Sequence, residues 1–126
     1  DSGILHTLLE IDNLNSLLGH PIAGYSWEGY CVEQIIGNMP RWRPHYYRTS
    51  SGEEIDLILE KENRRLTFEI KLSTSPTVSK GYYDTISLLQ PEKSWLIAPI
   101  KDSWILRNGT TIISITELIT ELRKYN

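Results

Sequence analysis

The chain has 126 residues, of which 40% are hydrophobic and 23% are charged, and its formal net charge is -3. This is the size of one ordinary domain, and the composition excludes a disordered chain and a membrane-spanning one. It also excludes a strongly basic surface, so any contact with nucleic-acid phosphates must come from a local patch. The single cysteine, Cys31, excludes an internal disulfide and a cysteine-based zinc site, which favours a reducing, cytoplasmic location.

Residues 1–126 are expected to form a single domain, with residues 1–23 as a helical lead-in and residues 24–126 as the core. Apolar residues at helical spacing between positions 4 and 18 predict two short helices that stop at 19–21. No apolar run approaches the ~20 residues that a membrane helix needs, so we expect no membrane partner. Because the chain begins with Asp1 and its only methionine is Met39, we expect a fragment of a longer protein.

Residues 25–36 predict a longer helix, bounded by Gly24 on one side and by Gly37 on the other. On a helical wheel, Glu28 falls in the middle of the apolar side of this helix, whereas Glu33 points the other way. A carboxylate on a buried stripe is costly unless a proton, a cation or hydrogen-bond donors compensate it. Glu28 is therefore either a functional acid or a buried acid that is hydrogen-bonded to a tyrosine or to the backbone.

The pattern then changes to period two, which predicts a sheet. An antiparallel meander is followed by a helix and an apolar strand, and this order indicates a crossover to a parallel strand. A hairpin around Asn108-Gly109 and a terminal helix capped by Ser114 and Glu117 complete the chain. The predicted ranges are strands at 45–49, 54–60 and 65–72, a helix at 79–89, a strand at 95–100, and hairpin strands at 104–107 and 110–114.

The meander places two acids side by side. If residues 61–64 close the hairpin symmetrically, Ile58 pairs with Thr67 and Asp56 pairs with Glu69, and strand alternation puts Asp56, Glu69 and Lys71 on one face. Like charges at opposed positions destabilise a sheet, whereas a hard divalent cation such as Mg²⁺ or Mn²⁺ reverses the sign of the interaction. With Lys71 to hold an attacking water, the pattern indicates metal-assisted phosphodiester hydrolysis. The alternative is a solvated strand face on which Lys71 pairs with Glu69 or Glu54.

Asp56, a spacer and Glu69-Ile70-Lys71, preceded by a helix with Glu28, resemble the core of the PD-(D/E)XK nuclease superfamily. The whole chain also resembles the C-terminal domain of unknown function of bacterial and archaeal AAA-type ATPases. The resemblance to that domain rests on the segments DSGI at 1–4, GYSWE at 24–28, YRTSSGEEID at 47–56 and FEIKLS at 68–73.

The resemblance implies a restriction-endonuclease-like α/β fold, in which helices flank a mixed sheet made of an antiparallel meander and a parallel strand. It also implies that Asp56, Glu69 and the carbonyl of Ile70 ligate Mg²⁺ or Mn²⁺. Lys71 then assists the nucleophilic water, and Glu28 contacts a metal-bound water or a second ion. Ile55 stands where the motif name has proline. The implied partner is an upstream AAA-type ATPase domain, to which ATP would bind.

Three arginines, Arg41, Arg43 and Arg48, are interleaved with aromatic residues before the acidic hairpin. Such a pattern can follow a phosphate backbone and stack on bases, so these arginines are candidate DNA contacts. The favoured alternative is an edge strand that is protected by charge and whose aromatic residues pack into the core. The functional hypothesis is a nuclease-like module, and the alternative is a non-catalytic domain that docks DNA or protein on the same scaffold.

Overall fold

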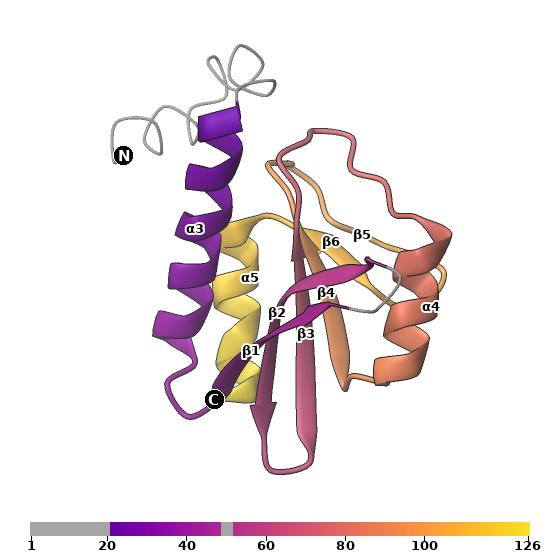
Figure 1. Cartoon of the computed structure of the whole chain (residues 1–126). Helices are drawn as coiled ribbons and strands as arrows, with labels where there is room; N and C mark the ends of the chain where they lie inside the picture. Colours follow the sequence, from indigo (N-terminus) through magenta and orange to yellow (C-terminus); the bar gives the residue numbers. More distant parts are fainter. Residues whose placement is uncertain (1–20, 49–51) are drawn as a thin grey trace.

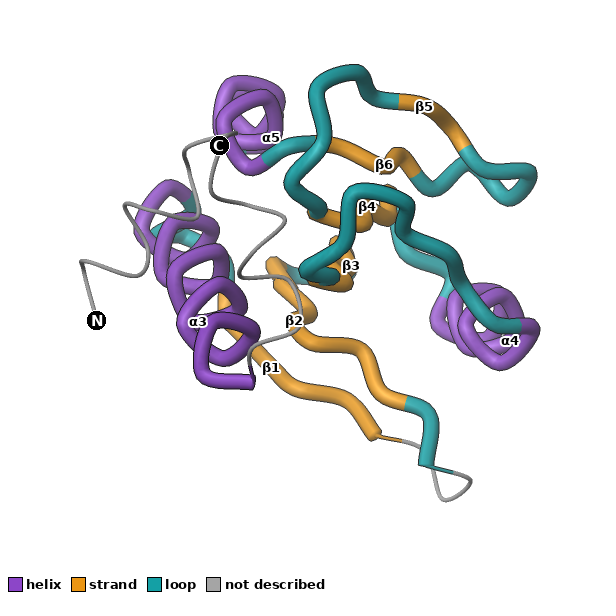
Figure 2. Tube along the Cα trace, turned by 90° about the horizontal axis from the view of Figure 1, so that it is seen from above, coloured by secondary structure: helices purple, strands orange, loops and turns teal. Residues whose placement is uncertain are grey.

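The computed structural model describes residues 21–48 and 52–126, which form a mixed sheet with helices on both faces. The strand order is β1-β2-β3-β4-β6-β5. Seen along the sheet in Figure 2, α3 and α5 lie on one side and α4 on the other. The elements are α3 (Pro21–Asn38), β1 (Arg43–Arg48), β2 (Glu54–Lys61), β3 (Arg64–Ile70), α4 (Lys80–Leu89), β4 (Lys93–Ile97), β5 (Trp104–Ile105), β6 (Thr111–Ile113), α5 (Ile115–Leu122) and the short 3₁₀ helix η1 (Arg123–Tyr125).

This architecture confirms the mixed α/β fold, with a meander and a parallel strand after the crossover (Figure 1). The two short helices predicted before residue 19 lie outside the described residues. Within the described ranges, no helix combines the length and the apolar character needed to cross a membrane.

Helix α3 is longer at both ends than its sequence pattern predicts. It begins at Pro21, because proline suits the first helical turn, where its missing N–H would have no partner inside the helix. Gly24 and Gly37, which were expected to bound it, lie inside it. The predicted wheel is confirmed: Cys31 is fully buried in the core and Glu33 is exposed.

The predicted hairpin register is confirmed at the pairs Ile58–Thr67 and Glu60–Arg65. The pairing of β1 with β2 is irregular, because His45 pairs with Ile58 while Tyr47 pairs with Ile55. Strand β2 therefore has one more residue than β1 over this stretch, which is a β-bulge. A bulge interrupts the alternation of side chains.

The bulge overturns one prediction about faces. Strict alternation puts Ile55 on the same face as Leu57 and Leu59, yet Ile55 packs with Ile58 and with Tyr82 of α4. Leu57 and Leu59 lie in the larger core between the sheet and the helices α3 and α5. The extra residue reverses the direction of the strand's side chains at this point.

The crossover matches the sequence prediction. Helix α4 begins after Ser79, whose hydroxyl accepts a hydrogen bond from the N–H of Tyr82 at 3.1 Å, and it ends at Gln90, which has a positive φ of 48°. Strand β4 then runs parallel to β3, with Ile97 beside Ile70. Strand β6 lies parallel to β4 and antiparallel to β5, so the predicted hairpin extends the sheet at its far edge.

Three apolar cores hold the layers together, and two of them border the open end of the meander. The larger one joins α3 and α5 to the sheet around Trp95, which stacks on Phe68 with ring centroids 5.1 Å apart. The smaller one lies beneath α4 and includes Tyr82 and Ile86. Together they hold in place the open end of the meander, where β2 and β3 separate.

Candidate functional site

Asp56 lies at the bulge of β2, where the ladder between β2 and β3 stops. The last paired residues are Leu57 and Phe68. Beyond them, the carboxylate Oδ2 of Asp56 accepts a hydrogen bond from the backbone N–H of Ile70 at 2.8 Å. The Asp56 side chain therefore replaces backbone pairing between the two strands and is held at the open end of the hairpin.

Glu28 reaches Asp56 from helix α3. Burial raises the pKa of the Glu28 carboxyl, and the charge of Asp56, a hydrogen bond with Asp56 and the charge of Glu54 raise it further. The helical wheel had predicted that Glu28 lies on the buried side of the helix, and the side chain is indeed half-buried. It meets the carboxylate of Asp56 there.

Glu69 reaches Asp56 from strand β3. Burial raises the pKa of Glu69 to about 9, and a hydrogen bond with Asp56 and the charge of Asp56 contribute to the same effect. The charge of Lys71 and the backbone N–H of Asp56 act in the opposite direction. Glu69 therefore holds a proton at neutral pH when no cation is bound.

The three acids open into two neighbouring cavities. Asp56 and Glu28 line one of about 370 Å³, together with Tyr46, Tyr47, Arg48, Glu54 and Ile55. Glu69 and Lys71 line another of about 320 Å³, together with Glu53, Thr77, Val78, Ser79 and Tyr82. Asp56, Glu69 and Lys71 were expected to share one face of the sheet. Glu69 and Lys71 do line one cavity together, whereas Asp56 lies at the bulge and opens to the other cavity.

Lys71 follows β3 directly, and its backbone is fixed from both sides. Its N–H donates to the carbonyl of Ile97 at 2.9 Å, and its carbonyl accepts from Nε1 of Trp27 at 3.3 Å. The ammonium group faces the cleft of Glu69 and lowers the pKa of that acid. Lys71 is thus positioned to interact with a group bound beside Glu69.

The residues at the open end suit a hard divalent cation. Within residues 21–48 and 52–126, no three His, Cys, Asp or Glu side chains are grouped so that they could together hold a metal ion. The pair Asp56–Glu69 remains, and Mg²⁺ commonly uses one or two carboxylates with water completing its shell. The N–H and C=O of a strand residue point to the same side, so the carbonyl of Ile70 faces the side of Asp56. A cation bound at this pair would displace the proton that Glu69 carries.

Two residues at the site were not predicted from the sequence. Glu53 lies over the first turn of α4, where its carboxylate accepts a hydrogen bond from Ser79 Oγ at 3.4 Å. Gly81 makes this approach possible, because a Cβ at this position would collide with the Glu53 carboxylate. The sequence signal was the acidic pair Glu53-Glu54, but nothing in it indicated that Glu53 would reach helix α4.

The predicted nucleic-acid residues lie on or beside strand β1, and their environments differ. Arg48 pairs with Glu54 at 2.6 Å, whereas Arg41 and Arg43 are exposed and have no hydrogen bond or ion pair to the described residues. The expectation that the aromatic residues pack inward is correct for Trp42, which is buried and donates to the carbonyl of Tyr125. It is also correct for Tyr47, which packs against the core beneath α4, but it is wrong for Tyr46, whose exposed fraction is 76%.

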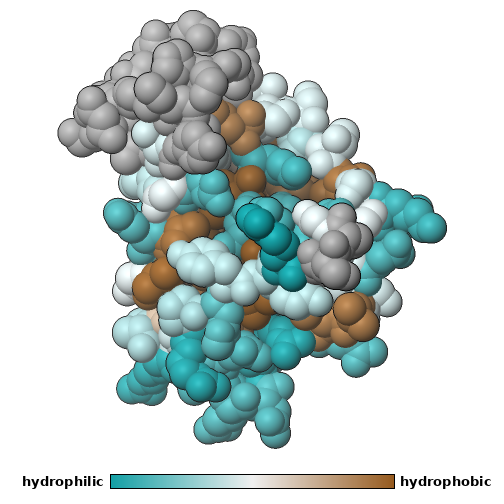
Figure 3. All heavy atoms as spheres, in the orientation of Figure 1, coloured by the Kyte–Doolittle hydropathy of each residue, from teal (hydrophilic) through white to brown (hydrophobic). Residues whose placement is uncertain are grey.

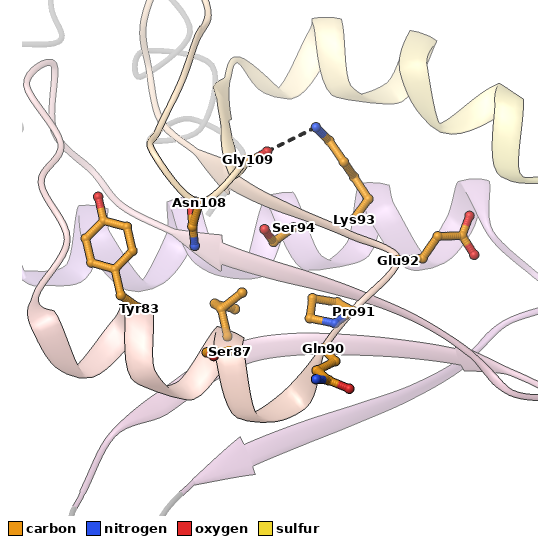
Figure 4. A pocket seen from close by; sticks show the side chains of 10 residues that line it. Tyr83, Ser87, Gln90, Pro91, Glu92, Lys93, Ser94, Asn108 and Gly109 are labelled. Carbon is orange, nitrogen blue, oxygen red and sulfur yellow. Dashed lines mark hydrogen bonds between the residues drawn. The ribbon is translucent and has the colours of Figure 1, made fainter.

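A third cavity, of about 440 Å³, lies at the C-terminal end of α4 and is shown in Figure 4. The charged side chains that line it already form hydrogen bonds or an ion pair within the protein. Nζ of Lys93 donates to the carbonyl of Gly109 and, at 2.7 Å, to Oγ1 of Thr111. Glu92 forms a bidentate pair with Arg64 at 2.8 and 2.9 Å. With its charges satisfied in this way, the cavity is a weaker candidate for catalysis than the acidic clefts.

The chain matches a family model and two mycobacterial proteins. Residues 23–118 match the family described as "Domain of unknown function (DUF4143)". Two mycobacterial relatives, uncharacterized protein Mb2031c of Mycobacterium bovis and uncharacterized protein Rv2008c of Mycobacterium tuberculosis, are each 30% identical over 120 residues. The match covers 95% of this chain and 27% of each relative, so the chain spans about a quarter of the length of these proteins.

Proposed function

We propose a function for this chain, which belongs to the DUF4143 family: it is a nuclease-like module that hydrolyses phosphodiester bonds of DNA with the help of Mg²⁺ or Mn²⁺. The proposal includes a restriction-endonuclease-like fold and an upstream AAA-type ATPase domain in the full-length protein. The observation that carries it is the meeting of Asp56 with Glu69 and Glu28 at the open end of the hairpin.

The electrostatics of the acids support the proposal. A protein gains nothing in stability from three carboxyl groups in partly buried positions, two of which have raised pKa values. Perturbed acids that line a cleft are typical of functional sites. Asp56 and Glu69, with the carbonyl of Ile70, would hold the cation. When bound, the cation neutralises phosphate charge and lowers the pKa of bound water.

The chain's own residues then have separate roles in the reaction. A water oxygen attacks phosphorus, the bond from phosphorus to the leaving oxygen breaks, and a proton passes to that oxygen. Lys71, beside Glu69 in the cleft, orients the attacking water and balances the charge of the phosphate. Glu28 reaches Asp56 from the opposite side of the open end and accepts a hydrogen bond from a second water.

The activity is tested with a circular DNA substrate in the presence of Mg²⁺ or Mn²⁺. We expect Asp56→Ala and Glu69→Ala each to abolish cleavage, and Glu28→Gln to slow it. Glu33→Gln is the matched control, since Glu33 is an exposed acid on the same helix. Cleavage that survives both alanine substitutions would refute the assignment of the site.

Cation binding can be measured separately from cleavage. A ligand that binds only the native state raises the melting temperature, and the effect grows with ligand concentration. We expect millimolar Mn²⁺ to stabilise the wild-type chain and to leave Asp56→Ala unchanged. A wild-type chain with an unchanged melting temperature would count against the metal site.

An unchanged melting temperature of the wild type would favour the alternative function, a non-catalytic domain that docks a protein partner. One observation supports it: the edge strand β5 exposes two large apolar residues, Trp104 at 41% and Ile105 at 68%. An open sheet edge can pair with a strand of another protein. Under this alternative, substitutions in β5 would weaken association while substitutions at Asp56 would have no effect.

A further inference from the structure

Helix α3 contacts the open end of the hairpin through two consecutive residues. Glu28 meets the carboxylate of Asp56 in β2. Trp27 donates its indole Nε1–H to the backbone carbonyl of Lys71, the residue that follows β3, at 3.3 Å. On the face in Figure 3, hydrophobic side chains form separate patches among hydrophilic ones, whereas Trp27 is buried in the larger core and is only 2% exposed. The same helix therefore contacts both sides of the hairpin where its strands separate.

These contacts close into a ring. The N–H of Ile70 donates to Oδ2 of Asp56 at 2.8 Å, and Asp56 meets Glu28. Glu28 directly follows Trp27 in α3. The indole of Trp27 bonds to Lys71, which directly follows Ile70. Because each member of the ring is restrained from two directions, the position of Lys71 relative to the acids of the site depends on Trp27.

The indole bond helps to set the direction of the Lys71 side chain. The N–H of Lys71 donates to the carbonyl of Ile97 at 2.9 Å, so β4 holds the peptide plane before its Cα. The bond from Trp27 holds the peptide plane after it. Since a residue has only two soft backbone dihedrals, holding both planes sets the direction of its Cα–Cβ bond. The Lys71 side chain is thereby directed into the cleft that it lines with Glu69.

The bond requires tryptophan at position 27. An indole N–H can only donate, and a buried donor without an acceptor is costly. The ring of Trp27 is packed in the larger core and stacks on Tyr30, with ring centroids 6.4 Å apart. Phenylalanine would fill much of the same space but could not donate a hydrogen bond to the carbonyl of Lys71.

We infer that Trp27 is a positioning residue, which holds the backbone of Lys71 so that its ammonium group stays beside Glu69. The inference rests on the proposed function, in which Lys71 orients the attacking water. Trp27 lines neither acidic cleft, so it acts through Lys71 and touches neither cation nor substrate. Its loss should impair the chemical step more than the binding of the cation, because Asp56 and Glu69 hold the cation.

The test compares Trp27→Phe with Trp42→Phe. Trp42 is the matched control, because it lies in the same core, is only 3% exposed and donates its Nε1–H to a backbone carbonyl, that of Tyr125, at 3.1 Å. It also lines neither acidic cleft. Each variant loses one indole hydrogen bond in the core, so a difference between them at the site reports on the bond to Lys71.

The rate of cleavage of circular DNA is measured in single-turnover experiments at several Mn²⁺ concentrations. We expect Trp27→Phe to slow cleavage about 10- to 100-fold, since a displacement of about 1 Å can cost roughly 100-fold in rate. The Mn²⁺ concentration that gives half the maximal rate should stay at its wild-type value, and Trp42→Phe should cleave like the wild type. The inference is refuted if the two variants cleave alike, or if Trp27→Phe changes only the Mn²⁺ requirement.

The anchoring of Lys71 is tested without substrate or metal. Amide hydrogen exchange, measured by NMR in EDTA, reports on the bond from the N–H of Lys71 to Ile97. We expect the protection of this amide to fall about 2- to 12-fold further in Trp27→Phe than in Trp42→Phe, the equivalent of one hydrogen bond. Equal losses of protection in the two variants would overturn the inference.

Failure of this inference and failure of the proposed function give different results. If the wild type does not cleave DNA and the Lys71 amide loses extra protection in Trp27→Phe, the nuclease is rejected and the anchoring is supported. If the wild type and Trp27→Phe cleave at the same rate, the nuclease is supported and the positioning role is rejected. Circular dichroism checks that each variant is folded. Should Trp27→Phe not fold, benzothienylalanine at position 27 replaces the N–H by sulfur and removes only the donor.

Discussion

Replacing Glu69 by glutamine tests the electrostatics of the site without any substrate. The pKa of Glu69 is about 9 in the folded protein, against an ordinary value of 4.5. Between these two values the folded state retains a proton that the unfolded state has lost, so the free energy of unfolding falls as the pH rises. The stabilisation of the folded state by the proton on Glu69 is complete below about pH 4.5 and is lost by about pH 9.

The size of this change in the free energy of unfolding follows from the shift in the pKa of Glu69. One proton corresponds to about 1.4 kcal/mol per pH unit, or roughly 4 kcal/mol between about pH 5 and about pH 8 as an upper limit. Glutamine cannot ionise, so the Glu69→Gln variant should lack this decline. It should match the wild type near pH 5 and be more stable near pH 8.

The assay is urea denaturation of the metal-free chain at several pH values across this range, followed by tryptophan fluorescence. Glu33→Gln provides the control, because it makes the same substitution at an exposed acid of helix α3. If the profiles of wild type and Glu69→Gln run parallel between pH 5 and pH 8, Glu69 does not carry the buried proton, and the reasoning about the acidic pair is wrong.

Two further predictions concern helix α4 at the edge of the cleft. Ser79→Ala should lower the free energy of unfolding by about 1 kcal/mol, because the N–H of Tyr82 loses its acceptor; a loss under about 0.3 kcal/mol in urea denaturation would contradict this. Gly81→Ala should raise the free energy of unfolding by up to about 0.5–1 kcal/mol, since alanine favours a helix and only the mobile end of Glu53 stands in its way. The opposite result, in which Gly81→Ala lowers the free energy of unfolding of the wild type but not that of a Glu53→Ala variant, would contradict this. It would show that the Glu53 carboxylate is held firmly over the helix.

The order of elements could be read from the sequence because its signals are local. The turn at Asn108-Gly109 and the cap at Ser114 each depend on neighbouring residues, and the structure places both of them as predicted. The wheel of α3 was also sufficient to place Glu28 on the buried side. The ends of α3 were misplaced, because the glycines at positions 24 and 37 are tolerated inside a helix whose face packs on a sheet.

The candidate site itself was only partly determined by local patterns. The pairing of Ile58 with Thr67 follows from the turn, and it brings Asp56 close to Glu69. The bulge opposite Tyr46 arises from the pairing of β2 with β1, and no local signal in the sequence marks it. Its consequence is that Ile55 packs beneath α4 and Asp56 opens toward Glu28.

The sequence by itself thus determined the succession of helices and strands, the hairpin register and the side of α3 on which Glu28 lies, because each depends on side-chain periodicity or turn chemistry within a short segment. Only the tertiary structure decided that Asp56 bonds to the N–H of Ile70, that Glu53 rests over Gly81 and that Tyr46 remains exposed. The physical reason is that these features depend on how separate strands and a helix meet. The cost of desolvating an acid depends on the groups that surround it, and residues distant in the sequence supply those groups.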